Sequence, residues 1–265
     1  RLKQDTNHEI KAVLATYNET STGVTSSIPG IRGALNAANH PALLFVDGVS
    51  AIASIEFRMD DWGVDGAISG SQKGFMLPAG LAILAFSQKA LKATETSTSR
   101  RAFLSLQDQI NSNKDGYTPY TPSTPMLHGL RAALDLLLEE GMDNVYARHH
   151  RLGEGVRRAV AAWGLKICAE AGVESDTVTA IVVPEGKDAR DVISIAFNKY
   201  NISLGAGLTQ LSGKVFRIGH IGDMNDVSLL GAIAGVEMAL LDSGINITAG
   251  SGVAAALEYY RSTAN

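Results

Sequence analysis

Lys73 and Asp47 are the residues of this chain whose types and positions best suit catalysis. Lys73 lies in the run SGSQKG at residues 69–74, and Asp47 ends the apolar run ALLFVD at residues 42–47. A lysine amine can form a Schiff base with a carbonyl group, and a carboxylate can keep a heterocyclic nitrogen protonated. A lysine after a glycine-rich turn is also often only a solvated side chain, so the pair alone leaves both interpretations open.

Thr20 and Arg217 extend this set of polar residues. Thr20 follows a predicted strand at residues 11–17, and Arg217 lies within the run KVFRIG at residues 214–219. Ligands of open α/β sheets bind at the carboxyl ends of the strands, where we expect Thr20, Asp47 and Lys73. Arg217 either extends outward to solvent or binds an anion. An amine and a carboxylate at such strand ends are what a pyridoxal-phosphate enzyme needs.

The elements that must position these residues follow an α/β pattern. Strands are predicted at residues 11–17, 42–46, 66–69 and 81–86, with turns and helices between them, which indicates a mostly parallel sheet. The apolar content predicts that strand 42–46 is covered on both faces and that strand 81–86 is buried. Residues 117–125 contain three prolines and are predicted to be non-helical.

The later part of the chain has a different pattern. A helix beginning near Leu127 is followed, after Gly141, by a second helix from Val145 to Trp163. Short strands (165–169, 177–183, 214–219) then alternate with helices (188–200, 225–242), and a final helix covers 249–262. We therefore predict a large α/β domain over residues 1–145 and a small α+β domain over 146–265, linked by the helix at about 143–163.

Composition excludes several classes of function. The chain has 265 residues, of which 45% are hydrophobic, and a net charge of −4, so neither a basic face nor a nucleic-acid partner is expected. It contains no apolar run long enough for a membrane span and no secretory signal core, which predicts a soluble, cytoplasmic protein. The six histidines have no metal-ligand spacing, so no metal site is expected.

Two other motifs are interpreted as structural. The single cysteine, Cys168, lies in an apolar stretch, so we expect a buried strand residue with an unreactive thiol. The pattern at Gly250 and Gly252 matches part of a dinucleotide fingerprint, but no acidic residue follows at the distance that would bind the ribose, so a helix cap is the better interpretation.

Five ordered motifs together resemble a known family. They are NETSTGV (18–24), FVD (45–47), SGSQKG (69–74), YTPST (120–124) and FRIG (216–219). Their order and content are similar to class V aminotransferases of the fold type I pyridoxal-phosphate superfamily, with the nearest resemblance to serine–glyoxylate and alanine–glyoxylate aminotransferases. The resemblance covers nearly the whole chain and implies an α/β large domain, a smaller α+β domain and pyridoxal 5′-phosphate as cofactor.

The resemblance also implies roles for residues around the cofactor. Lys73 would carry the cofactor as a Schiff base and move the proton during transamination, and Asp47 would bind the pyridine nitrogen. Val49 would pack against one face of the ring, the Thr20 hydroxyl would lie near the ring oxygen, and Gln72 would contact the phosphate.

Three further residues gain roles from the resemblance. Thr121 matches a threonine that reaches the phosphate of the neighbouring subunit, which implies a homodimer. The accompanying family tyrosine stands three residues earlier, where this chain has Thr118. Tyr117 and Tyr120 are near this position, and Tyr117 is our candidate for that contact. Arg217 would bind the substrate carboxylate through two parallel hydrogen bonds.

The activity implied is a ping-pong transfer of an amino group from serine or alanine to a 2-oxo acid such as glyoxylate. Another class V reaction, that of a lyase or a desulfurase, is the enzymatic alternative, although a desulfurase needs a reactive cysteine. Family members also carry a phosphate loop and a stacking aromatic residue that residues 1–17 do not match. The chain is therefore expected to be the C-terminal portion of such an enzyme, and a non-catalytic fragment is the third interpretation.

Overall fold

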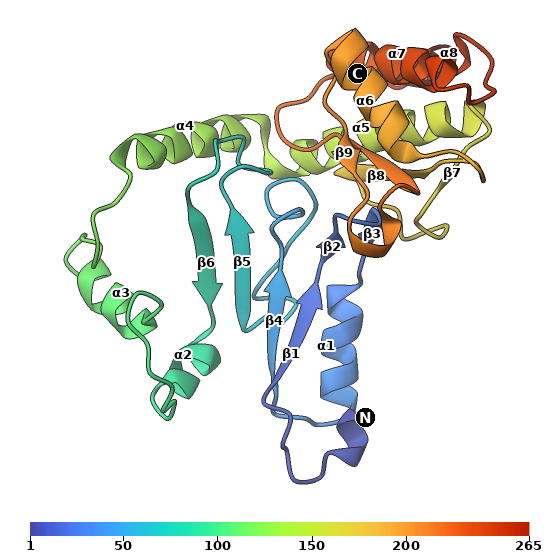
Figure 1. Ribbon diagram of the computed structural model, residues 1–265. Helices are drawn as coiled ribbons and strands as arrows, with labels where there is room; N and C mark the ends of the chain where they lie inside the picture. Colours follow the sequence, from blue (N-terminus) through green and yellow to red (C-terminus); the bar gives the residue numbers. More distant parts are fainter. Residues whose placement is uncertain (265) are drawn as a thin grey trace.

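The computed structural model of the chain describes residues 1–264 and contains two four-stranded sheets (Figure 1). The first sheet has the order β1-β4-β5-β6, formed by Ala12–Thr16, Leu43–Asp47, Gly66–Gly70 and Ala82–Phe86. Strands β1, β4 and β5 are parallel, whereas β6 runs antiparallel to β5. The prediction of a mostly parallel sheet is therefore confirmed.

One face of this sheet packs on helix α1 (Ile28–Ala37). The buried side chains of Leu44, Val46 and Ala67 lie in one core cluster with Ile28 and Leu35 of the helix. The helix begins after Ser27, whose hydroxyl accepts a hydrogen bond from the Gly30 N–H.

The opposite face of the sheet is largely open. Leu14 is 80% exposed, and Ile68 and Leu84 are also exposed. The prediction that strand 42–46 is covered on both faces is therefore wrong, because the burial of β4 alternates along the strand. The prediction that strand 81–86 is buried is wrong as well, since every residue of β6 is exposed or only partly buried.

The segment between the two sheets forms an extended arm. It contains α2 (Gln88–Thr94), α3 (Leu106–Asn113) and α4 (Thr124–Glu140), which lie at the left of Figure 1. The proline-rich residues 117–125 are non-helical up to Ser123, and α4 then begins with Pro125 in its first turn. At Gly141 the positive φ of 84° separates α4 from α5.

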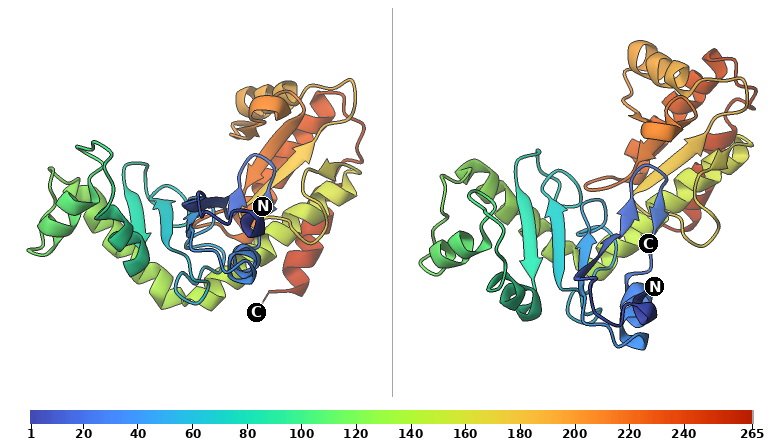
Figure 2. Two further views of the ribbon diagram at one scale, coloured as in Figure 1. Left: turned by 90° about the horizontal axis from the view of Figure 1, so that it is seen from below. Right: turned by 60° about the horizontal axis from the view of Figure 1, so that its bottom comes forward.

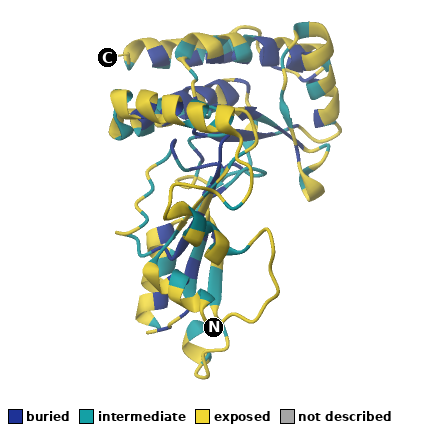
Figure 3. Ribbon diagram, turned by 90° about the vertical axis from the view of Figure 1, so that its left-hand side faces the viewer, coloured by how far each residue is buried: buried dark blue, intermediate teal, exposed yellow. Residues whose placement is uncertain are grey.

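Helix α5 (Met142–Ala162) is the predicted linking helix, and it leads into the second sheet. This sheet has the order β7-β8-β10-β9 and is antiparallel, formed by Lys166–Ile167, Val178–Val182, Val215–Gly219 and Gly205–Ala206. Helices α6 (Ala189–Tyr200), α7 (Asp226–Asp242) and α8 (Ser251–Ser262) pack with α5 around Phe216 and Ile181. The right view of Figure 2 shows the second sheet beyond one end of the first, and Figure 3 shows buried residues where these helices meet.

Two local predictions can be compared with this architecture. Cys168 follows β7 and is half-buried, so its prediction as a buried strand residue is wrong, although burial does raise the pKa of its thiol. Gly250 is the N-cap residue of α8, as predicted. The Gly250 and Gly252 N–H groups bind the buried Glu237 carboxylate. The domain boundary at residues 145 and 146 falls inside α5 and stays a prediction.

Within residues 1–264, no helix is both long and apolar enough to cross a membrane. The same part of the chain contains no cluster of histidine, cysteine and acidic side chains that could hold a metal ion.

Candidate active site

A cavity of about 190 Å³ lies between the two sheets and brings together three of the predicted site residues. The lining contains Thr20 and Lys73 from the first part of the chain and Arg217 from the second. The remaining residues of the wall are Ser50, Thr177, Val178, Gly205, Gly219 and Ile221. Residues nearly 200 positions apart in sequence therefore line one small pocket.

Lys73 enters this cavity from a tight turn after β5. The turn packs closely on residues 52–54, since a Cβ atom on Gly74 would lie only 2.3 Å from the Ile52 carbonyl oxygen. Burial, and after it the positive charge of Arg217, lowers the pKa of the Lys73 amine, and the Asp47 carboxylate opposes this shift. The lowered pKa increases the fraction of unprotonated amine, which is the nucleophilic form.

Arg217 is held in place by backbone carbonyl groups on both sides. Its Nε donates to the Ala206 carbonyl and its Nη1 donates to the Thr20 carbonyl, each at 3.0 Å. Gly205 opposes Arg217 in the sheet, and a Cβ atom there would approach the Arg217 Nε to 3.1 Å. The remaining N–H groups of the guanidinium are available to an anion in the cavity.

A hydrogen-bonded network of polar side chains joins the two halves of the cavity wall. The Thr20 and Ser50 hydroxyl oxygens lie 2.6 Å apart. Thr177 donates to the Ser50 carbonyl at 2.8 Å and accepts from the Asn18 side-chain amide at 3.0 Å. Asn18, Ser50 and Thr177 are buried, so these bonds fix the approach of β8 to the loop after β4.

Sequence reasoning missed these three network residues. The only signal was the presence of short polar residues beside apolar strands, and this pattern does not reveal partners up to 159 residues away. Ile221 and Gly219 also line the cavity without having been predicted.

Asp47 and Val49 lie at the carboxyl end of β4, close to but outside this cavity. Asp47 Oδ1 accepts a hydrogen bond from the Val49 N–H at 3.0 Å. The Asp47 side chain also borders a second hollow of about 290 Å³, which lies on the open apolar face of the first sheet beside Leu14 and Phe45. Gln72 directly precedes Lys73 in the turn and is exposed.

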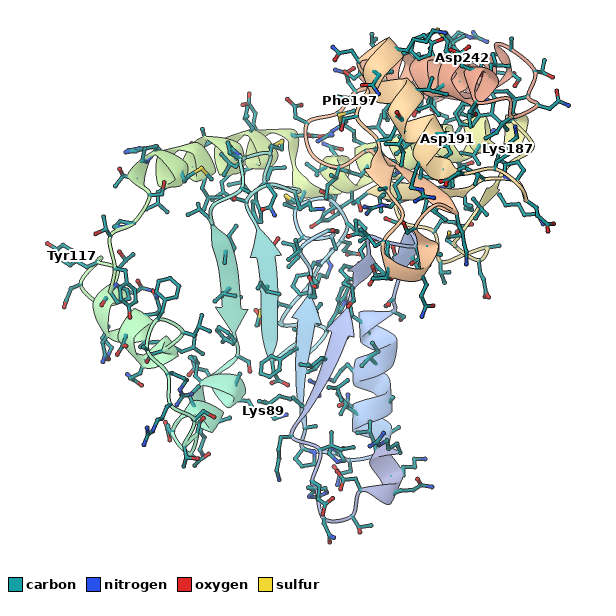
Figure 4. The ribbon with its side chains drawn as sticks, viewed as in Figure 1. Lys89, Tyr117, Lys187, Asp191, Phe197 and Asp242 are labelled. Atoms are coloured by element: carbon teal, nitrogen blue, oxygen red, sulfur yellow. The ribbon has the colours of Figure 1, made fainter. Side chains whose placement is uncertain are left out.

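Tyr117 and Thr121 are not brought together with Lys73. They belong to the loop between α3 and α4 and line a separate hollow with Thr118 and Tyr120. Figure 4 places Tyr117 at the outer end of the arm, far from the second sheet. Neither residue lines the Lys73 cavity of the same chain.

The comparisons with known proteins agree with this architecture. The family model for "Aminotransferase class-V" matches residues 1–219. A serine–glyoxylate aminotransferase from Methylorubrum extorquens is 59% identical over 98% of this chain, and an L-aspartate–glyoxylate aminotransferase from Paracoccus denitrificans is 55% identical over 99%. The chain spans 66% of the length of each of these curated relatives.

Solved structures give the same result for the fold. A pyridoxamine–pyruvate aminotransferase from Mesorhizobium loti superposes with a TM-score of 0.91 at 29% identity, covering 99% of this chain and 68% of that one.

Proposed function

Because the chain belongs to the class V aminotransferases, we propose that the whole protein transfers an amino group from a small amino acid to a 2-oxo acid. Serine or alanine is the proposed donor and glyoxylate the proposed acceptor, in a ping-pong reaction. The observation that carries this proposal is the cavity in which the Lys73 amine, with its lowered pKa, faces the half-buried Arg217 guanidinium.

The residues around this cavity fit pyridoxal 5′-phosphate, which is the proposed cofactor. Lys73 offers an amine as the attachment point, Asp47 offers a carboxylate at the end of β4, and Thr20 offers a hydroxyl group. When bound, the cofactor supplies an electron sink for the bonds of the substrate α-carbon. Val49 is proposed to pack on the ring and Gln72 to contact the phosphate.

Lys73 and Asp47 divide the proton chemistry between them. The unprotonated Lys73 amine would accept the proton from the substrate α-carbon and then donate it to the C4′ atom of the cofactor. It can act as this base because its pKa lies below the ordinary lysine value. One oxygen of the Asp47 carboxylate accepts a hydrogen bond from the Val49 N–H, and this bond fixes the orientation of the carboxylate. The other oxygen is free to hold the proton of the pyridine nitrogen.

Arg217 is proposed to bind the α-carboxylate of both substrates. Its guanidinium is anchored to the Ala206 and Thr20 carbonyl groups, so its free N–H groups keep one orientation. A planar guanidinium group in a fixed orientation can bind a carboxylate through two parallel hydrogen bonds. This contact would place the substrate α-carbon near Lys73.

We further propose a homodimer in which the arm completes the partner's site. Tyr117 and Thr121 lie outside the Lys73 cavity of their own subunit, and this position supports contacts with the cofactor phosphate of the neighbouring subunit. The cytoplasmic location predicted from the sequence belongs to the same proposal.

The alternative reactions have less support. A desulfurase needs a cysteine thiolate at the substrate, whereas Cys168 lies outside the cavity wall and its thiol pKa is raised by burial. A non-catalytic role does not account for a lysine with a lowered pKa that faces an anchored arginine.

A donor and acceptor panel on the full-length protein tests the proposal. Serine, alanine, aspartate and cysteine are each paired with glyoxylate and pyruvate, and both products are measured. We expect the fastest transfer from serine or alanine to glyoxylate, and we expect the Lys73→Ala variant to be inactive with every pair. Release of sulfide from cysteine, or no transfer with any pair, would contradict the proposal.

A further inference from the structure

The peptide groups of Gly222 are bound by two consecutive residues of helix α5. The Gly222 N–H donates to His149 Nε2 at 3.1 Å, and the Gly222 carbonyl accepts from Arg148 Nη1 at 2.9 Å. Arg148 also donates to the Met224 carbonyl, and it forms an ion pair with Glu140 of α4. Helix α5 therefore fixes the loop that follows β10.

The bond from Gly222 to His149 requires one particular form of the imidazole ring. His149 is fully buried, and its Nδ1 lies 2.7 Å from the Val145 carbonyl oxygen. A carbonyl oxygen can only accept, so Nδ1 carries the proton and donates it to Val145. The unprotonated Nε2 is then the acceptor for the Gly222 N–H.

The loop held in this way connects the two parts of the active site. It begins at the end of the strand that carries Arg217, and its residue Ile221 lines the cavity. Gly222 itself lies against the lysine turn, since a Cβ atom on it would be 3.4 Å from the Lys73 carbonyl oxygen. Gly222 thus lies between the Lys73 turn and the two residues of α5 that bind its peptide groups.

We propose that His149 is a positioning residue of the reaction, which acts through the Gly222 peptide to hold Arg217 at its working distance from Lys73. Arg148 supports the same peptide through its carbonyl oxygen. The part of this inference that concerns substrate binding rests on the proposed aminotransferase function. The part that concerns the geometry of Lys73 and Arg217 is independent of it.

The experiment compares two His149 variants of the full-length protein. His149→Leu removes the acceptor and leaves the Gly222 N–H without a partner, whereas His149→Gln can place an acceptor oxygen near the position of Nε2. Val156→Ala is the control, because Val156 is fully buried in the same helix but belongs to the helical core. Arg148→Gln is a second test variant at a partly exposed position, which serves if His149→Leu does not fold.

Two quantities are measured for each variant. The first is the KM for the amino donor and for the oxo acid, in the protein loaded with cofactor. The second is the pKa of the Lys73 amine in the cofactor-free protein, from the pH dependence of its chemical labelling. Burial and then the Arg217 charge lower this pKa, so it reports whether Arg217 remains in place.

We expect His149→Leu to raise both KM values about tenfold or more with a smaller effect on kcat, and to raise the Lys73 pKa toward its ordinary value. His149→Gln should stay near the wild type in both measurements, and Val156→Ala should change stability alone. An unchanged Lys73 pKa in His149→Leu, or in Arg148→Gln where His149→Leu does not fold, would overturn the inference. If the wild type fails to transaminate, the proposed function fails, while the labelling measurement still decides the role of His149.

Discussion

Burial is the main reason that the pKa values of three side chains in this protein, Lys73, His149 and His220, are lowered. Lys73 loses part of its proton affinity because it is half-buried beside Arg217. His149 and His220 are fully buried and neutral, and each is held in one tautomer by a backbone carbonyl group. These two histidines lead to a prediction about pH.

Stability should fall as the pH drops below about 6.5, the ordinary histidine pKa. Burial lowers the pKa of His149, and burial followed by the Arg157 charge lowers that of His220 to about 3. Above the ordinary value both histidines are neutral in the folded and unfolded states, so their contribution to the free energy of unfolding is complete. Below it the unfolded chain binds protons that the folded chain does not, and the contribution decreases until the pH reaches the folded-state pKa.

Urea unfolding between about pH 7 and pH 5 measures this effect, because carboxylates with ordinary or lowered pKa values stay largely ionised there. We expect the midpoint of unfolding to decrease across this range, and to decrease less in His220→Gln. If the urea midpoint decreased equally with pH in the wild type and in this variant, the assignment of the effect to His220 would be contradicted.

At the scale of the elements, most long strands and helices follow from the apolar pattern of the sequence. The strands around Asp47, Lys73 and Arg217 and the linking helix α5 were predicted close to their observed bounds. The two-residue strands β2 (Asn18–Glu19), β3 (Val24–Thr25) and β9 were not predicted, because so short a run has no periodicity. Helix α1 was also missed, since its two glycines weaken the helical signal that Ser27 and Pro29 provide at its start.

The site was predictable only in part for a related reason. Lys73, Thr20 and Arg217 stand at strand ends or in recognisable motifs. The contacts of Thr177 with Ser50 and of Gly222 with His149 join residues 127 and 73 positions apart. Such pairs depend on how the two sheets pack, which local patterns do not encode. The burial of β6 was misjudged for the same reason, because it depends on what covers the strand.

The pairing of β9 with β10 leads to a prediction about Gly205. Its replacement by alanine should raise the KM for both substrates, because the new Cβ atom would approach Arg217 Cβ and Nε to 3.1 Å and displace the guanidinium. Gly231→Ala in α7 is the matched control, since no neighbouring atom lies within 4 Å of its added Cβ. Steady-state kinetics of both variants check this. A Gly205→Ala enzyme with the KM values of the control would contradict the close packing of Gly205 on Arg217.

In the whole molecule, the arm and the open face of the first sheet both lie outside the candidate active site. The loop with Tyr117 and Thr121 lies outside its own Lys73 cavity, so the proposed dimer can be tested by mixing inactive subunits. Randomly mixed Lys73→Ala and Thr121→Val subunits should regain about a quarter of the wild-type activity at limiting cofactor. Half of the dimers in such a mixture contain one subunit of each kind, and each of these dimers has one intact site out of two. No recovery would show that Thr121 acts within its own subunit.

The central claim is that Lys73 is the residue that carries the cofactor. Reduction of the full-length, cofactor-loaded protein with borohydride, followed by digestion and mass spectrometry, tests this claim most directly. We predict a single modified peptide that contains residues 69–74, with the pyridoxyl group on Lys73. Modification of another lysine, or of none, would contradict the account.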